Sequence, residues 1–218
     1  MAFSSLAEID DYMKTNKCEF WEAVIREEAR DSQQPEMDIV NRMTKMYRSM
    51  KEADEAYDDS LTSHSGLSGK NGKKMADYAV THKCMCGEFG GAVMARAIKM
   101  AESNACMKRI VAAPTAGSCG VVPAILITYE RMTNTSENDM VKSLFVAAGI
   151  GDVIARRASI SGARGGCQAE IGASSAMAAG ALAWLKSGSS HLITQAAAMA
   201  LKSLLGLVCD PVAGLVEV

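Results

Sequence analysis

Cys167 and Cys209 stand beside predicted helix ends, where a thiol could react or bind a metal. Cys167 lies in the glycine-rich segment 161–170, and a helix is predicted to begin directly after it. The N–H groups and the dipole of a helix N-terminus lower the pKa of a thiol. Cys209 follows a predicted helix, in the turn-forming segment 206–214. These positions suit metal ligands, but neither spacing matches a zinc finger or a ferredoxin, and either cysteine could be a buried structural residue.

Segment 113–123 is a candidate site for a small carboxylate. Pro114 and Gly117 predict a turn, and Ser118 is predicted to cap the apolar helix that follows. Unsatisfied N–H groups at such a helix start would bind an anion. An ordinary capped loop is the alternative.

The other cysteines and the histidines are weaker candidates. Cys84 and Cys86 could form half of a metal site or a redox pair. The remaining thiols are interpreted as core or surface residues: Cys18, Cys106 and Cys119. The three histidines are scattered, which disfavours a histidine-rich zinc site. His64, in a Ser- and Gly-rich segment, is a candidate acid or base, with a solvated loop histidine as the alternative.

The composition excludes several classes of protein. The 218 residues carry 23 Lys and Arg against 25 Asp and Glu, so a broad surface for nucleic acid or anionic membrane is not expected. The 5% aromatic content leaves few side chains to stack on nucleic-acid bases. Seven cysteines without regular spacing favour reduced thiols over a disulfide framework.

No targeting or membrane-spanning segment is predicted. Residues 1–13 lack the basic start and apolar stretch of a signal peptide. The uncharged stretch 171–185, which consists mainly of small residues, is too short to cross a membrane. We therefore expect a cytoplasmic protein.

The charges divide the chain into two parts. Residues 1–60 hold 15 acidic and 8 basic side chains, whereas residues 61–218 hold 10 and 15. We interpret the first part, residues 1–60, as an acidic helical segment and the second, residues 61–218, as a tightly buried core. Segments 172–183 and 195–200 consist almost entirely of small residues and Met, which lets helices approach closely.

Apolar residues at three- and four-residue spacing predict an all-α protein, because strand signals are weak. Residues 60–74 are predicted to form a loop. Helices are predicted over residues 6–13, 20–30, 35–57, 87–107, 119–132, 137–158, 168–186 and 191–205.

Several strings together resemble the α chain of the two-subunit, iron–sulfur-dependent L-serine dehydratases, from about residue 35 onward. They are IVAAPTAGS (110–118), ASISG (158–162), GCQAE (166–170), SAMAA (175–179) and LLGLVCDPVAGLV (204–216), with the Ser-Gly-Leu loop at 63–70.

The resemblance implies a mostly helical chain with a [4Fe-4S] cluster. Three cysteines hold this cluster, so one of its four irons has no protein ligand. Cys167 and Cys209 match the first two ligands. In the family the third follows shortly after the Gly-Leu-Val segment, and this sequence stops at Val218. We therefore expect these 218 residues alone to be cluster-free and inactive.

The implied reaction removes water from L-serine and gives pyruvate and ammonia, without pyridoxal phosphate. An open iron would polarise the hydroxyl group, and a base would remove the α-proton. Candidates for the base are His64, Glu170 and an iron-bound group. Residues expected to bind the substrate carboxylate or ammonium are Thr115, Gly117, Ser118, Ser161 and Gly162.

The implied partners are L-serine and a β subunit, in an oligomer. Two other interpretations stay open. One is a zinc or redox-thiol module using Cys84 and Cys86. The other is a non-catalytic helical subunit that only binds a partner.

Overall fold

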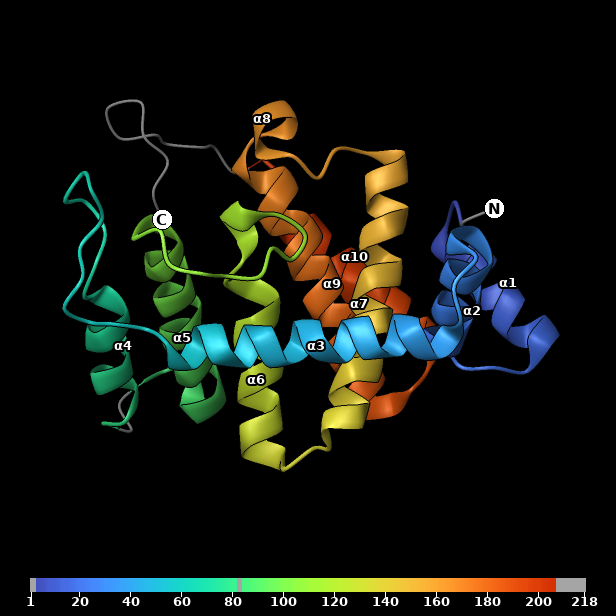
Figure 1. Ribbon diagram of the computed structural model, residues 1–218, viewed down its shortest axis with the longest axis horizontal. Helices are drawn as coiled ribbons and strands as arrows, with labels where there is room; N and C mark the ends of the chain where they lie inside the picture. Colours follow the sequence, from blue (N-terminus) through green and yellow to red (C-terminus); the bar gives the residue numbers. More distant parts are fainter. Residues whose placement is uncertain (1–2, 82–83, 207–218) are drawn as a thin grey trace.

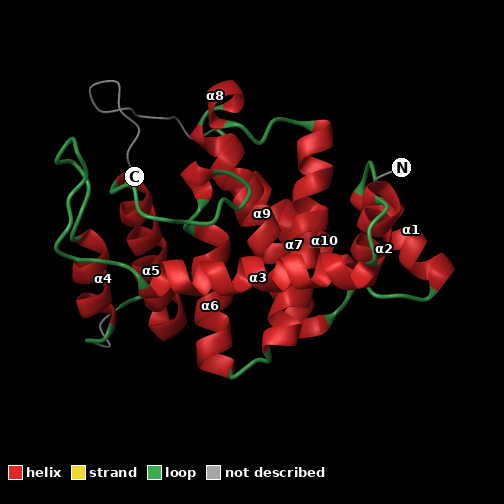
Figure 2. Ribbon diagram, in the orientation of Figure 1, coloured by secondary structure: helices red, strands yellow, loops and turns green. Residues whose placement is uncertain are grey.

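The computed structural model describes residues 3–81 and 84–206, which contain ten α-helices, one 3₁₀-helix and no strand (Figures 1 and 2). The predicted all-α class is confirmed. The elements are α1 (Leu6–Asn16), α2 (Phe20–Ser32), α3 (Glu36–Glu55), α4 (Asn71–Ala79), α5 (Gly87–Ala105), η1 (Ala116–Ser118), α6 (Val121–Thr133), α7 (Glu137–Arg157), α8 (Gly162–Gly165), α9 (Cys167–Ser187) and α10 (Ser190–Ser203).

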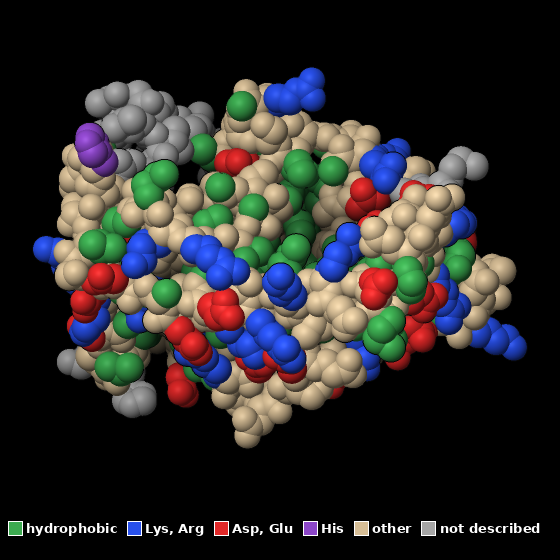
Figure 3. Space-filling view, viewed as in Figure 1, with side chains coloured by type: hydrophobic (Ala, Val, Ile, Leu, Met, Phe, Trp, Pro, Cys, Tyr) green, Lys and Arg blue, Asp and Glu red, His purple; other side chains and the backbone are tan. Residues whose placement is uncertain are grey.

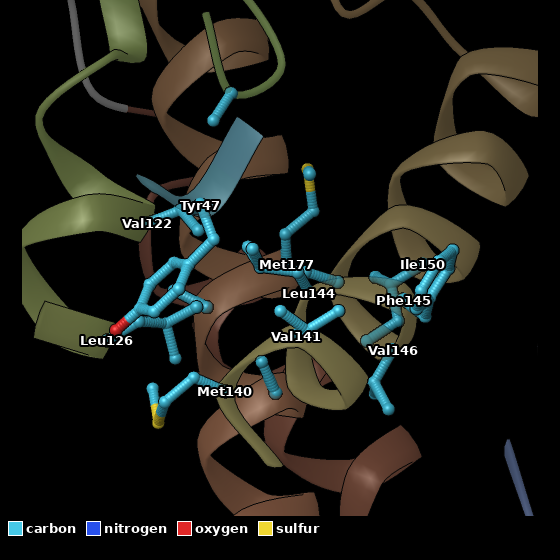
Figure 4. Packing of buried hydrophobic residues seen from close by; sticks show 14 of the residues in the cluster. Tyr47, Val122, Leu126, Met140, Val141, Leu144, Phe145, Val146, Ile150 and Met177 are labelled. Atoms are coloured by element: carbon cyan, nitrogen blue, oxygen red, sulfur yellow. The ribbon is translucent and has the colours of Figure 1, made fainter. Parts of the chain in front are cut away.

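Helix α7 lies at the centre of the core. Eleven of its residues, from Met140 to Val153, are buried. They pack against α2, α3 and α9, and Figure 4 shows Tyr47 of α3, Leu126 of α6 and Met177 of α9 around them. Helix α3 crosses in front of α5, α6 and α7 (Figure 1). Burying apolar side chains from so many helices is the main stabilising contribution to this arrangement.

Small side chains bring α9 close to its neighbours, in agreement with the prediction for segment 172–183. A Cβ atom at Gly180 would overlap the end of the Ile150 side chain in α7. A Cβ at Gly151 would lie 2.9 Å from Sδ of Met177. Helices α9 and α10 form an antiparallel hairpin, and the buried positions of α9 are mostly Gly, Ala and Ser.

A buried ion-pair network attaches α3 to α5 and α6. The side chain of Asp54 is 6% exposed and contacts Nε of Arg96 at 2.8 Å and Nη2 of Arg131 at 3.2 Å. Arg96 also donates a hydrogen bond to Thr128 of α6. Lys, Arg, Asp and Glu side chains cover the outer face along α3 (Figure 3). Ion pairs of both directions therefore join the two parts of the sequence, since Arg48 and Lys51 of the first part also contact Glu137 of the second.

The predicted loop 60–74 ends earlier than expected, because α4 begins at Asn71. Glu102 of α5 is 2% exposed and accepts hydrogen bonds from the backbone N–H groups of Asn71 at 2.7 Å and Gly72 at 3.1 Å. The Tyr57 hydroxyl donates to the same carboxylate at 2.7 Å. A cap supplied by another helix satisfies the N–H groups at the start of α4 and leaves no local sequence signal.

None of the helices in residues 3–81 and 84–206 is both long and apolar enough to cross a membrane.

Candidate functional site at the start of α9

Three segments meet at the N-terminal end of α9, and one of them lies far from the other two in the sequence. They are the turn 113–118, which contains η1, the short helix α8, and the first turn of α9 (Figure 1). Most of the residues predicted to bind substrate lie in these segments.

The turn 113–118 is fastened to α9 and α5 by hydrogen bonds. Ser174 of α9 is fully buried, and its hydroxyl donates to the carbonyl of Ala113 at 2.7 Å. Asn104 of α5 donates from Nδ2 to the carbonyl of Ala116 at 3.2 Å. The peptide bond between Ala113 and Pro114 is cis. Ser174 and Asn104 were not predicted as site residues, because nothing in the sequence signals their contacts with this turn.

Ser118 is not the N-cap of α6, contrary to the prediction. The N-cap is Gly120, and Ser118 is the last residue of η1. Its hydroxyl lies 3.1 Å from that of Thr115 and accepts a 3.4 Å hydrogen bond from the Thr115 N–H group. The 3₁₀ turn uses the serine for its own closure, so Ser118 is not available to the following helix.

The chain enters α9 through Gly166, whose φ of +76° favours glycine. Cys167 is the first residue of α9 and is half-buried. The prediction that a helix begins at this cysteine is therefore confirmed to within one residue. Ser161 precedes α8, and its carbonyl accepts hydrogen bonds from the N–H groups of Arg164 and Gly165 at 3.1 and 2.9 Å.

The carboxylate of Glu170 joins the three segments. A Cβ atom at Gly117 would lie 2.5 Å from Oε2 of Glu170, and a Cβ at Gly162 would lie 2.6 Å from the same oxygen. Real side-chain atoms do not approach so closely, so any larger residue at either position would displace the carboxylate. The two glycines thus form a cradle for Glu170, which we call the Glu170 cradle.

Glu170 and Cys167 are three residues apart in α9 and therefore lie on the same face of the helix, about 5–6 Å apart at Cβ. The structure thus brings together seven predicted residues: Thr115, Gly117, Ser118, Ser161, Gly162, Cys167 and Glu170.

His64 lies in a different part of the molecule. It is exposed in the loop between α3 and α4, which Figure 1 shows beside α4 and apart from α8. This loop closes on itself: the Ser63 N–H group donates to the carbonyl of Ser68 at 2.8 Å, and the Ser68 N–H group donates to Oγ of Ser63 at 3.1 Å. Among the described residues, no hydrogen bond or ion pair connects His64 to Glu170.

The described residues do not complete a metal site. Within residues 3–81 and 84–206, no group of three His, Cys, Asp or Glu side chains is arranged to hold a metal ion. Cys209 lies outside the described residues. Cys167 is the one implied cluster ligand inside them, and a single thiolate does not hold an iron–sulfur cluster.

The remaining described thiols differ in their surroundings. Cys119 is buried, as predicted for a core thiol, and burial raises its pKa to about 11. Burial also raises the pKa of Cys18. Cys86 is exposed just before α5, and Cys84 packs against Gly91 of that helix.

A cavity of about 410 Å³ lies between α2, α3 and α7, and none of the predicted site residues lines it. Its walls are mainly apolar, with Ile39 and Phe145 among them. Charged residues at its rim already pair with each other, as Arg42 does with Glu28 and Arg156 with Asp152. It therefore lacks the unpaired polar groups expected of a catalytic centre.

Residues 15–218 match the serine dehydratase alpha chain family. The chain belongs to this family. It is 38% identical to the probable L-serine dehydratase alpha chain of Bacillus subtilis over 99% of this chain and 72% of the relative. The L-serine dehydratase alpha chain of Peptoniphilus asaccharolyticus is 35% identical over 96% of this chain and 72% of the relative. L-serine dehydratase 1 of Escherichia coli is 46% identical over 56% of this chain and 27% of its own length.

Family membership confirms the resemblance drawn from the glycine- and cysteine-containing strings. The match includes the turn 113–118, α8 and α9, which are the segments that meet at the Glu170 cradle.

Proposed function

We propose that this chain is the α subunit of an L-serine dehydratase, and that the turn 113–118, α8 and the first turn of α9 bind the substrate. The observation that supports the proposal is the Glu170 cradle, because it unites three of the family-like strings in one place. The near full-length matches to α chains of L-serine dehydratases support the choice of substrate.

The proposed reaction removes the α-proton and the hydroxyl group of L-serine, and the aminoacrylate product hydrolyses to pyruvate and ammonia. Hydroxide is a poor leaving group, so the reaction needs an electrophile at the hydroxyl oxygen and a base at the α-carbon. Candidates for the base in this chain are His64 and Glu170. Since His64 lies in a separate loop, it would have to reach the substrate by a movement of that loop.

The residues around the cradle can bind the two ends of an amino acid. The hydroxyls of Thr115 and Ser161 are half-buried donors and acceptors beside the glycines. The absence of side chains at Gly117 and Gly162 lets the Glu170 carboxylate lie directly against both segments, where a ligand bound to them would meet it. We assign substrate carboxylate and ammonium binding to these segments.

We further propose that Cys167 and Cys209 are ligands of a [4Fe-4S] cluster. Cys167 is the first residue of α9, and the N–H groups and dipole of a helix N-terminus stabilise an anionic ligand such as the thiolate that binds iron. When bound, the cluster would supply an electrophilic iron for the substrate hydroxyl.

The test uses the full-length α chain assembled anaerobically with its β subunit. We expect pyruvate from L-serine, together with iron–sulfur absorbance and about four irons per α chain. A matched reaction with pyridoxal phosphate added should give no increase. One zinc per chain with no iron, or a cluster-free complex that forms no pyruvate, would contradict the proposal.

A further inference from the structure

Glu170 differs from the other half-buried and buried carboxylates of the described chain in having no partner. Asp54 contacts two arginines, Glu102 accepts three hydrogen bonds, and Glu130 contacts Lys51 at 3.2 Å. No hydrogen bond or ion pair to Glu170 occurs within residues 3–81 and 84–206. Partial burial without a cation is unfavourable for a carboxylate, so this group is suited to receive one from a ligand.

The Glu170 cradle holds the carboxylate in one place without using its hydrogen-bonding capacity. Gly117 and Gly162 offer only Cα–H groups to Oε2, and these are weak donors. An ionised carboxylate can accept about four hydrogen bonds. Most of this capacity stays available to a donor from a ligand.

From these observations we infer that Glu170 binds the ammonium group of the substrate and makes the site selective for α-amino acids over 2-hydroxy acids of the same shape. A primary ammonium has three N–H donors and a positive charge, whereas a hydroxyl in its place has one donor and no charge. This inference rests on the proposed function, since it takes the same segments as the substrate site.

The position of Glu170 also orients the ligand. Cys167 lies one turn earlier on the same face of α9, within about 5.4 Å along the helix axis. An amino acid held through its ammonium at Glu170 is therefore close enough for its side chain to reach Cys167. A carboxylate that is neutralised by an ammonium is a poor base, so removal of the α-proton falls to another group.

The test measures binding of L-alanine and L-lactate to the full-length α chain in complex with its β subunit, by isothermal titration calorimetry. L-Alanine has no hydroxyl to eliminate, so binding is measured without turnover, and L-lactate carries a hydroxyl in place of the ammonium. We expect the unmodified complex to bind L-alanine at least about tenfold more tightly. Glu170→Gln should abolish this preference. Gly162→Ala, whose Cβ displaces the carboxylate, should weaken it as well.

Glu88→Gln is the matched control, because Glu88 is an exposed acidic residue in the first turn of α5. This variant should keep the preference for L-alanine. Thermal unfolding of each variant verifies that it is folded, and if Glu170→Gln does not fold, Gly162→Ala decides the result.

Equal binding of the two ligands by the unmodified complex, or a preference that survives in Glu170→Gln, would overturn the inference. A Glu170→Gln variant that keeps the preference but has lost kcat for L-serine would identify Glu170 as the base instead. Pyruvate formation in the same samples tests the proposed function separately. A preference that depends on Glu170 in a complex that forms no pyruvate would support the ammonium site and contradict the dehydratase activity.

Discussion

Ser174, buried in α9, donates a 2.7 Å hydrogen bond to the carbonyl of Ala113, just before the turn that carries Thr115, Gly117 and Ser118. This bond fixes the distance between the turn and the helix that carries Glu170. The Glu170 cradle depends on that distance, because Gly117 is on one side of the bond and Glu170 on the other.

Replacing Ser174 with Ala should lower the free energy of unfolding by about 1–2 kcal/mol, since the buried carbonyl of Ala113 loses its 2.7 Å donor and keeps only the longer hydrogen bond from Ser118. The KM for L-serine should rise as the turn shifts. Urea denaturation and steady-state kinetics measure the two effects. Ser187→Ala is the control, because this exposed serine donates only to a carbonyl of its own helix. Equal stability of the two variants would show that the bond does not hold the turn.

Gly120 is needed where α6 approaches α5. A Cβ at this position would lie 2.7 Å from the backbone carbonyl oxygen of Ala97, which cannot rotate away. Gly120→Ala should therefore destabilise the protein by about 1–3 kcal/mol. Gly172→Ala is the comparison, because its Cβ would meet only a methyl group of Leu201 at 3.2 Å. We expect that variant to stay within about 0.5 kcal/mol of the parent, and similar melting temperatures for both variants would contradict this account.

Glu102→Ala should lower the local stability of α4. The variant removes the acceptor for the N–H groups of Asn71 and Gly72 and for the hydroxyl of Tyr57. Hydrogen exchange in residues 71–79 should become faster by at least about tenfold, corresponding to about 1.4 kcal/mol of local stability. Glu55→Ala removes an exposed carboxylate from the end of α3 and should leave this exchange unchanged. Unchanged protection of α4 in Glu102→Ala would show that the helix does not depend on the cap.

Stability should fall in acid partly because of Glu137. Hydrogen bonds from Arg48 hold the pKa of the Glu137 carboxyl below its ordinary value, partial burial acts in the opposite direction, and Lys51 lowers the pKa further. A carboxyl whose pKa is lower in the folded state stabilises the protein above its unfolded pKa, and the stabilisation is lost as the pH falls through the folded value.

Arg48→Met should therefore weaken the dependence of the urea midpoint on pH between about pH 7 and pH 3. Arg42→Met is the control. It removes a 3.4 Å contact with Glu28, whose carboxylate is more exposed than that of Glu137, and it should leave the pH dependence of the urea midpoint close to that of the parent. The same slope in Arg48→Met and the parent would contradict the assignment to Glu137.

The helices could largely be predicted from the sequence because their apolar residues recur at helical spacing. Helix α7 begins at the predicted residue and ends one residue early. Helix α4 could not be predicted, because its cap comes from Glu102, about 30 residues further along the chain. Ser118 was placed in the wrong role for a related reason, since the sequence does not show whether a hydroxyl bonds to its own turn or to the next helix.

The residues of the candidate site could be predicted from the sequence, but the contacts between them could not. The strings around Gly117, Gly162 and Glu170 were each recognisable, whereas the contact between them depends on how α9 packs against η1 and α8. The sequence placed His64 in a loop, but it could not show that this loop is separate from the start of α9, because that depends on the packing of α3 and α4. The assignment of Cys167 and Cys209 as ligands of one iron–sulfur cluster stays a prediction.

We propose that the start of α9 is the catalytic centre of an L-serine dehydratase. The most direct test compares pyruvate formation from L-serine by Cys167→Ser and Cys86→Ser, each in the full-length α chain assembled anaerobically with the β subunit. We predict that Cys167→Ser lowers kcat/KM by at least about 100-fold and that Cys86→Ser stays within about twofold of the parent. Equal activity of the two variants, or loss of activity only in Cys86→Ser, would contradict the claim.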